Sequence, residues 1–195
     1  MIKMKARINM SRRYFACVYG GASEKIDDIY KNEVEKLGKI IVDNGFSLVY
    51  GAGATGCMGA VARGVTASGG YVMGISPHFI SKFEEIYDCD NTVMVDTMGE
   101  RKTLMEKHGD LFIIAPGGIG TMDEFFQVLT LKYLERLIKP IVILNYNGFY
   151  DELIALMKAL IKNKAVMAEI ENYYTVIDSA DDPRLVEIFN KIKEA

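Results

Sequence analysis

Short apolar runs that lack polar alternation are the feature of this sequence that most constrains its fold. They are rich in β-branched and aromatic residues. The runs occupy residues 14–19, 46–50, 71–75, 92–95, 111–115 and 141–144, with a weaker run at 175–177. Strands that are buried on both faces have this composition, as in parallel sheets covered by helices. The runs therefore predict the strands of a parallel sheet.

Longer segments with helical periodicity separate these runs. They occupy residues 28–44, 57–68, 98–108, 122–134 and 150–162, and Pro183 opens a last one that reaches the C-terminus. In the first segment, Val34, Leu37 and Ile41 recur at helical spacing, and Gly45 follows as a stop signal. Strand–helix alternation along a whole chain implies right-handed βαβ units. The sequence therefore predicts an α/β fold with a doubly wound, mostly parallel sheet and helices on both faces.

Length and composition fit one domain that spans residues 1–195. Area scaling predicts that a chain of this length buries about 70% of its surface on folding. Half of the residues are hydrophobic and a quarter are charged, which excludes disorder for the body of the chain. The net charge of −3 gives no sign of the basic surface of a nucleic-acid-binding domain. No apolar run approaches the length of a membrane span.

The sequence offers few residues for metal or redox chemistry. The three cysteines are widely spaced and form no CxxC pattern, which favours a reducing cytoplasm over a disulfide framework. His78 and His108 are the only histidines and stand far apart. A zinc site and a histidine-based triad are therefore both disfavoured, and we expect no bound metal.

The start of the chain is basic. Lys3, Lys5, Arg7, Arg12 and Arg13 precede the first acidic residue, Glu24. A basic binding arm is one interpretation, but we favour a flexible N-terminal extension over residues 1–12. The apolar run after Arg13 is too short for a secretory signal.

Glycine-rich turns follow three of the predicted strands. They are Gly20-Gly21-Ala22-Ser23, Gly51-Ala52-Gly53 and Pro116-Gly117-Gly118-Ile119-Gly120-Thr121. In open α/β sheets, ligands bind outside the carboxyl ends of the strands. We therefore expect the functional site where these turns meet.

The second turn belongs to a GxGxxG pattern that runs from Gly51 to Gly56. Between a strand and a helix this pattern suggests a dinucleotide site. The fingerprint also needs an acidic residue about 20 positions further on, and here the next acid is Glu84, well beyond the strand at 71–75. We therefore favour a turn that lines some other ligand over one that binds NAD(P).

Residues 116–124 carry the strongest functional signal. A glycine-rich turn that leads into a helix lets backbone amides approach an anion, and the helix N-terminus adds partial positive charge. The pattern predicts a phosphate site, with an unliganded tight turn as the alternative. No lysine follows the last glycine, so triphosphate hydrolysis is not indicated.

Local sequence favours a structural role over a catalytic one for two charged residues, Glu124 and Arg101. Residues 121–124 match the T-x-x-E capping box, so local sequence favours Glu124 as a helix cap over a catalytic carboxylate. Arg101 lies in a charged helical segment, where a solvated face is the local expectation. On that face Lys102 and Glu106 are spaced to pair at i,i+4.

Together these residues resemble the Lonely Guy (LOG) family, cytokinin-activating phosphoribohydrolases that are often labelled lysine decarboxylases. The family motif PGGxGTxxE stands complete from Pro116 to Glu124, and the element M-x-x-R-K spans Met98 to Lys102. The segments LVYGxG and GxMGAVA match residues 48–53 and 56–62. The similarity runs from about residue 14 to residue 164.

The resemblance implies a Rossmann-like fold and a homodimer that needs no metal or cofactor. It also implies hydrolysis of the N-glycosidic bond of nucleoside 5′-monophosphates, with adenine or an N6-substituted adenine as the base. Arg101 and Glu124 correspond to the family's catalytic pair. The residues that correspond to phosphate- and nucleotide-binding positions are Gly117, Gly118, Gly120, Thr121, Met98, Lys102, Gly51, Gly53 and Ser23.

Departures from the family pattern concern base specificity. Gly99 stands where many members have histidine, and Ala52 where many have a third glycine. Two other classes are weighed against the hydrolase. A molybdenum-cofactor carrier of the same superfamily would not need the pair Arg101 and Glu124, and a pyridoxal-phosphate decarboxylase would need a lysine in a Schiff-base context, which the sequence does not show.

Overall fold

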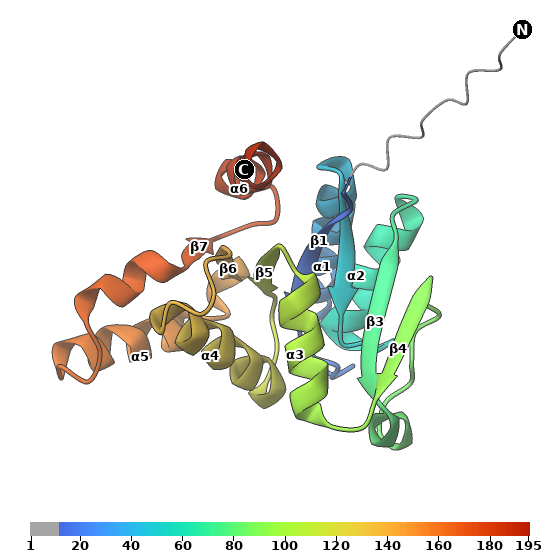
Figure 1. The fold of residues 1–195 in the computed structure, drawn as a ribbon, viewed down its shortest axis with the longest axis horizontal. Coiled ribbons are helices and arrows are strands. Elements are labelled where there is room, and N and C mark those ends of the chain that lie inside the picture. The colour runs from blue at the N-terminus through green and yellow to red at the C-terminus, as the bar shows by residue number, and fades with distance from the viewer. Residues whose placement is uncertain (1–11) are drawn as a thin grey trace, which may run out of the picture.

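A computed structural model describes residues 12–195, and within them seven strands form one sheet (Figure 1). The strands are β1 (Tyr14–Tyr19), β2 (Phe46–Tyr50), β3 (Val72–Pro77), β4 (Asn91–Val95), β5 (Leu111–Ile114), β6 (Ile141–Leu144) and β7 (Thr175–Ile177). Their order is β4-β3-β2-β1-β5-β6-β7, and every neighbouring pair is parallel. The predicted α/β class and doubly wound sheet are confirmed, and the sheet is wholly rather than mostly parallel.

Helices cover both faces of the sheet (Figure 1). They are α1 (Asp28–Asp43), α2 (Gly56–Ala67), α3 (Met98–His108), α4 (Ile119–Tyr133), α5 (Asp151–Lys162) and α6 (Pro183–Glu194). Short 3-10 segments lie at His78–Lys82, Tyr146–Gly148 and Ala168–Tyr173. One face packs against α1, α2 and α6, and the other against α3, α4 and α5.

The sheet's two buried faces explain its apolar runs. In β5, Leu111 and Ile113 join the core under α1, α2 and α6. Phe112 and Ile114 join the core on the opposite side. Because successive side chains of a strand point to opposite faces, a strand with a core on each side needs apolar residues at every position.

The strand order reverses between β1 and β5, and this position determines where a ligand can bind. Helix α1 follows β1 onto one face, whereas α4 follows β5 onto the other. The two connecting loops start side by side, since the Gly21 N–H donates to the Pro116 carbonyl at 3.0 Å. They then diverge, which leaves a crevice at the carboxyl ends of the strands.

Two predicted boundaries near this crevice are wrong. Helix α4 begins at Ile119 instead of residue 122, and its N-cap is Gly118. Thr121 therefore lies inside the first turn, where its side chain covers Gly117. The predicted capping box of Thr121 and Glu124 does not form, because the glycines allow the helix to start before Thr121. Strand β3 also extends to Pro77, beyond the predicted end at residue 75.

Most of the predicted N-terminal extension, residues 1–11, lies outside the described residues. Arg12 forms an ion pair with the buried Asp110 at 2.5 Å. The Arg13 guanidinium stacks over the Tyr71 ring at 3.9 Å. Within residues 12–195, no helix combines the length and apolar character that a bilayer span requires.

The crossing of α1 and α2 gives a test of the packing. A Cβ atom on Gly38 would lie 2.5 Å from the Val61 carbonyl oxygen, so Gly38→Ala must displace helix backbone. Overpacking of this kind typically costs about 1–3 kcal/mol, which for a chain of this size lowers the melting temperature by roughly 2–12 °C. Gly99→Ala on α3 is the control, since the nearest atom to its added Cβ is 3.8 Å away. If calorimetry gives the same melting temperature for both variants, α1 and α2 are not closely packed at Gly38.

Candidate functional site

A pocket of about 250 Å³ occupies the crevice at the carboxyl ends of the strands. Its lining residues come from the loops after β1 and β5, from α2, α3 and α4, and from the segment after β3. They are Gly20, Gly21, Ala22, Ser23, Met58, Glu84, Met98, Arg101, Gly118, Gly120, Thr121 and Glu124. Of the predicted site residues, the pocket brings together Ser23, Met98, Arg101, Gly118, Gly120, Thr121 and Glu124.

Arg101 and Glu124 face each other in this pocket from α3 and α4. The Arg101 Nη2 atom lies 3.8 Å from the Glu124 Oε1 atom, and both residues are buried, at 7% and 6% exposure. Nη2 also donates to the Gly51 carbonyl at 3.5 Å. The buried Nε atom of Arg101 has no hydrogen-bond partner. Arg101 is therefore an incompletely paired cation, and the expected solvated face is wrong for this residue.

A capping box does form in the site, but at the start of α3. The Thr97 hydroxyl accepts from the Glu100 N–H at 3.1 Å, and the Glu100 carboxylate accepts from the Thr97 N–H at 3.2 Å. This arrangement starts the helix at Met98 and directs the next residue, Arg101, toward the pocket. This box was not predicted, although residues 97–100 show the same T-x-x-E pattern as residues 121–124.

Glu124 is held in an environment that disfavours its charge. Burial raises the pKa of this carboxyl group to about 7, and the opposing effect of Arg101 is smaller. An optimally placed guanidinium would hold the pKa of a carboxylate below its usual range. At 3.8 Å the pair is too loose for that. The group is thus close to half-ionised at neutral pH, which suits proton transfer.

The loop at residues 116–121 presents unpaired amides at the start of α4. The first bond of the helix is that of the Met122 N–H to the Gly118 carbonyl. The amides of Ile119, Gly120 and Thr121 therefore have no intrahelical acceptor. A Cβ atom on Gly118 or Gly120 would meet no atom within 4 Å, so both glycines face open space. Together with the helix dipole, this arrangement can hold an anion.

Four predicted site residues lie outside the pocket lining. A Cβ atom on Gly51 would lie 1.8 Å from Arg101 Nη2, so only glycine leaves room for the guanidinium. On Gly53 it would lie 2.5 Å from the Met58 methyl group, and on Gly117 it would lie 2.1 Å from the Thr121 hydroxyl oxygen. These three glycines position other site residues.

Lys102 is the fourth predicted residue outside the lining. Its ammonium group pairs with Asp123 of α4 at 2.9 Å. The predicted pair with Glu106 does not form, because Glu106 instead accepts a hydrogen bond from Gln127. Lys102 therefore links α3 to α4 beside the pocket.

Glu84 is a pocket residue that the sequence analysis did not assign to the site. It follows the 3-10 segment His78–Lys82, which joins β3 to β4. An antiparallel bridge between Gly53 and Ile86 holds this segment against the second glycine-rich turn. No local motif marks the segment, so only the tertiary structure shows that Glu84 faces the pocket.

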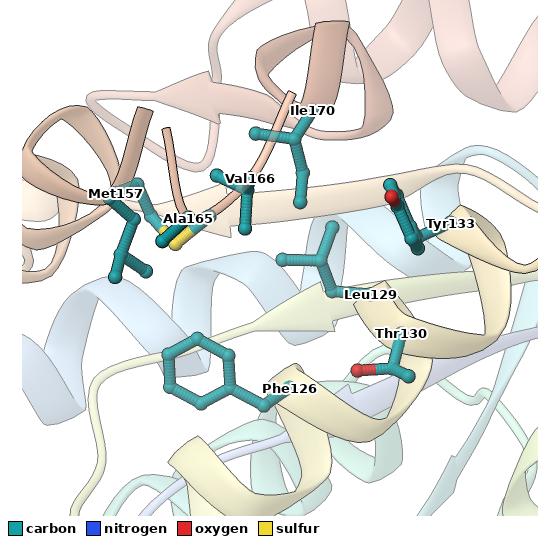
Figure 2. Close-up of a pocket in the computed structure, with 9 residues that line it drawn as sticks. Phe126, Leu129, Thr130, Tyr133, Met157, Ala165, Val166 and Ile170 are labelled. Atoms are coloured by element: carbon teal, nitrogen blue, oxygen red, sulfur yellow. The ribbon is translucent and has the colours of Figure 1, made fainter. Parts of the chain in front are cut away.

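A second pocket lies between α4, α5 and the segment Ala168–Tyr173, away from the strand ends. Figure 2 shows its labelled side chains, and the lining is Phe126, Leu129, Thr130, Tyr133, Met157, Leu160, Ala165, Val166 and Ile170. It is almost wholly apolar and lacks a carboxylate or a basic group. Within residues 12–195, no group of three or more His, Cys, Asp or Glu residues is placed to hold a metal ion. Of these two pockets, only the crevice is lined by charged side chains, so it is the candidate active site.

Comparison with known proteins identifies relatives of this chain. A family model described as "Possible lysine decarboxylase" matches residues 58–185. A cytokinin riboside 5′-monophosphate phosphoribohydrolase of Mycobacterium tuberculosis is 35% identical over 92% of this chain and 96% of its own length. Its Arabidopsis thaliana counterpart LOG2 is 30% identical over 90% of this chain and 82% of its own length.

Solved structures share the fold at lower identity. The molybdenum cofactor binding protein of Rippkaea orientalis has a TM-score of 0.70 and 21% identity over 93% of this chain and 98% of that one. The carrier protein of Chlamydomonas reinhardtii has a TM-score of 0.70 and 19% identity over 94% and 100%. Sequence relatives thus align over nearly the whole chain, and the matching family model covers more than half of it. The chain accordingly belongs to the LOG family of cytokinin riboside 5′-monophosphate phosphoribohydrolases.

Proposed function

We propose that this protein hydrolyses the N-glycosidic bond of purine nucleoside 5′-monophosphates, with adenine or an N6-substituted adenine as the base. The products are the free base and ribose 5-phosphate. The observation that carries the proposal is the buried pair of Arg101 and Glu124, which lies beside unpaired amides at the start of α4. One end of the pocket thus suits a phosphate, and the other suits charge separation at a sugar.

The proposed reaction breaks the bond between C1′ and the base nitrogen. The sugar gains positive charge and the departing base gains negative charge, as in O-glycoside hydrolysis through an oxocarbenium-like transition state. Glu124, when ionised, stabilises the sugar and accepts a proton from the attacking water. The water oxygen bonds to C1′, and the base finally carries the proton. Arg101 keeps its proton and complements the developing charge on the base.

The phosphate group has a separate role in this proposal. The amides of the first turn of α4 hold it, and the glycines at 118 and 120 let it come close. Binding energy from this remote group places C1′ between Glu124 and Arg101. Ser23, Met98 and Lys102 lie around the same pocket and complete the proposed nucleotide site.

A carrier without hydrolase activity is the second candidate. Its support is the shared fold of molybdenum cofactor carrier proteins. A buried carboxylate with a raised pKa has no evident task in a pure carrier of an anionic ligand, so hydrolysis is favoured. Amino-acid decarboxylation through pyridoxal phosphate is not supported, since no lysine is among the described residues that line the pocket.

We also propose a cytoplasmic homodimer. The family resemblance implies the homodimer. The three cysteines are widely spaced in the sequence and form no CxxC pattern, which favours a reducing compartment. Sedimentation equilibrium of the purified chain measures the association directly.

The first functional prediction concerns the reaction. Purified protein incubated with AMP or N6-isopentenyl-AMP, without added metal, should release the free base and ribose 5-phosphate. Adenosine should be a poor substrate, because it lacks the group that the α4 amides hold. Chromatography of the products measures both. Tight binding of nucleotides with no base released from any purine monophosphate would favour the carrier.

The second prediction tests Glu124. Glu124→Gln keeps the shape of the side chain but removes the base and its charge, which commonly costs about 10²–10⁴ in rate. We expect kcat for AMP to fall at least about a hundredfold, with near-normal melting, because glutamine relieves the burial of a charge. Glu106→Gln is the matched control: its carboxyl group also has a pKa raised by burial but lies outside the pocket. Comparable activity of the two variants contradicts the catalytic assignment.

The third prediction follows from the pKa of Glu124. With that pKa raised to about 7, lowering the pH through neutrality protonates the group that must be ionised. The kcat/KM for AMP should therefore fall below about pH 7, approaching about tenfold per pH unit. The residual activity of Glu124→Gln should lack this decline, which separates it from ionisation of the substrate phosphate at about pH 6. A wild-type midpoint near the ordinary carboxyl value would show that Glu124 is well hydrated or tightly paired.

A further inference from the structure

Tyr150 lies directly behind the phosphate-binding turn, although it does not line the pocket. It precedes α5, and its ring is buried at 3% exposure in the core under α3, α4 and α5. Its hydroxyl group donates to the Ala115 carbonyl at 2.6 Å in a fully buried hydrogen bond. Ala115 is the last residue before Pro116, where the turn into α4 begins.

The same hydroxyl oxygen reaches the far side of Pro116. The Gly117 N–H points at it, and this contact opposes part of the rise in the pKa of Tyr150 that burial causes. Before the turn, the Ala115 N–H still bonds to the Tyr19 carbonyl at 2.8 Å as the last contact with β1. Beyond the end of β5, hydrogen bonds to the Tyr150 hydroxyl group therefore replace those of the sheet. One oxygen atom contacts the backbone of Ala115 and of Gly117, on either side of Pro116.

This arrangement changes which amides are free for an anion. Gly117 does not line the pocket, and its N–H interacts with the Tyr150 hydroxyl group. The available amides are those of Ile119, Gly120 and Thr121, in the first turn of α4. Thr121 in turn rests on Gly117, since a Cβ atom there would lie 2.1 Å from the Thr121 hydroxyl oxygen. A shift of Gly117 would therefore move the amides that face the ligand.

Tyr150 is itself firmly held. Its backbone N–H donates to the Asn145 side chain at 2.6 Å, and the Asn145 amide group donates to Asp151 at 2.8 Å. The Asn145 N–H donates a hydrogen bond to the Ile177 carbonyl of β7 at 2.8 Å. The Phe149 ring meets the Tyr150 ring edge-on at 4.9 Å. The ends of β6 and β7 thus fix the position of the hydroxyl group.

We infer that Tyr150 is a positioning residue for phosphate: its hydroxyl group clamps the turn at Ala115–Gly117 and so sets the α4 amides in place for the substrate's 5′-phosphate. The inference rests on the proposed function for the identity of the ligand. A binding site is most effective when surrounding hydrogen bonds lock its geometry in advance. Tyr150 supplies that support without touching the substrate.

The experiment removes one oxygen atom. Tyr150→Phe keeps the ring but releases the Ala115 carbonyl and the Gly117 N–H. Loss of a buried hydrogen bond should weaken inorganic phosphate binding, measured by calorimetry, about tenfold, with an equal rise in KM for AMP. The kcat for AMP should change by less than about threefold, because at saturation the phosphate is still bound and C1′ is still placed. The kcat/KM for adenosine should stay the same, because adenosine has no phosphate. A purely structural role would instead lower all activities in proportion to the folded fraction.

Two further variants make the result decisive. Tyr174→Phe removes a hydroxyl group from the same core, at a ring that packs against Phe125, and should leave phosphate affinity unchanged. Asn145→Ala frees the backbone of Tyr150 while keeping its hydroxyl group, and should weaken phosphate binding by a smaller factor. It carries the test if Tyr150→Phe does not fold. Unaltered phosphate affinity in folded Tyr150→Phe, or in Asn145→Ala if Tyr150→Phe does not fold, overturns the inference.

The inference and the proposed function fail separately. If the wild-type protein binds phosphate and AMP but releases no base, the proposed hydrolysis is wrong while the phosphate affinities still test Tyr150. If AMP is hydrolysed and Tyr150→Phe keeps wild-type phosphate affinity and KM, the hydrolysis stands and the role of Tyr150 is wrong.

Discussion

The reversal of strand order between β1 and β5 is the constraint on which the site depends. Right-handed crossovers place α1 and α4 on opposite faces of the sheet, so the loops that lead to them must separate. A hydrogen bond from the Gly21 N–H to the Pro116 carbonyl holds the loops together at their base. Above it, the crevice opens between α4 and the loop after β1. Arg101 completes it from α3, which packs on the same face as α4.

Burial then gives the site its electrostatic character. Arg101 and Glu124 are both removed from water but do not form a tight ion pair, and one guanidinium nitrogen has no partner. Neither charge is fully compensated, which is unfavourable for the stability of the fold. A ligand that brings hydrogen-bond acceptors to Arg101 and positive charge toward Glu124 would relieve both costs. Polar groups that break the usual rules of burial tend to mark functional positions in this way.

The sequence predicts the layers of this fold well because burial on both faces leaves a direct pattern in the strands. It also predicts that the glycine-rich turns meet, since parallel strands end at one edge. A local pattern does not predict the structure where the same motif can adopt two structures. The motif T-x-x-E occurs at residues 97–100 and at 121–124, and only the first forms a capping box. The position of Glu84 and the partner of Lys102 depend on contacts between distant segments, which no local pattern contains.

The glycines of the site divide into two groups that the motif alone does not separate. An added Cβ atom on Gly51 or Gly117 would collide with Arg101 or Thr121, so these glycines let the protein pack against itself. On Gly118 or Gly120 it would project into open space, so glycine at these positions is not required by the fold. Under the proposed function, a side chain is excluded at these two positions because the phosphate comes within contact distance of the backbone. Within one short motif, the first glycine therefore serves the scaffold, and the next two leave room for the phosphate of the proposed substrate.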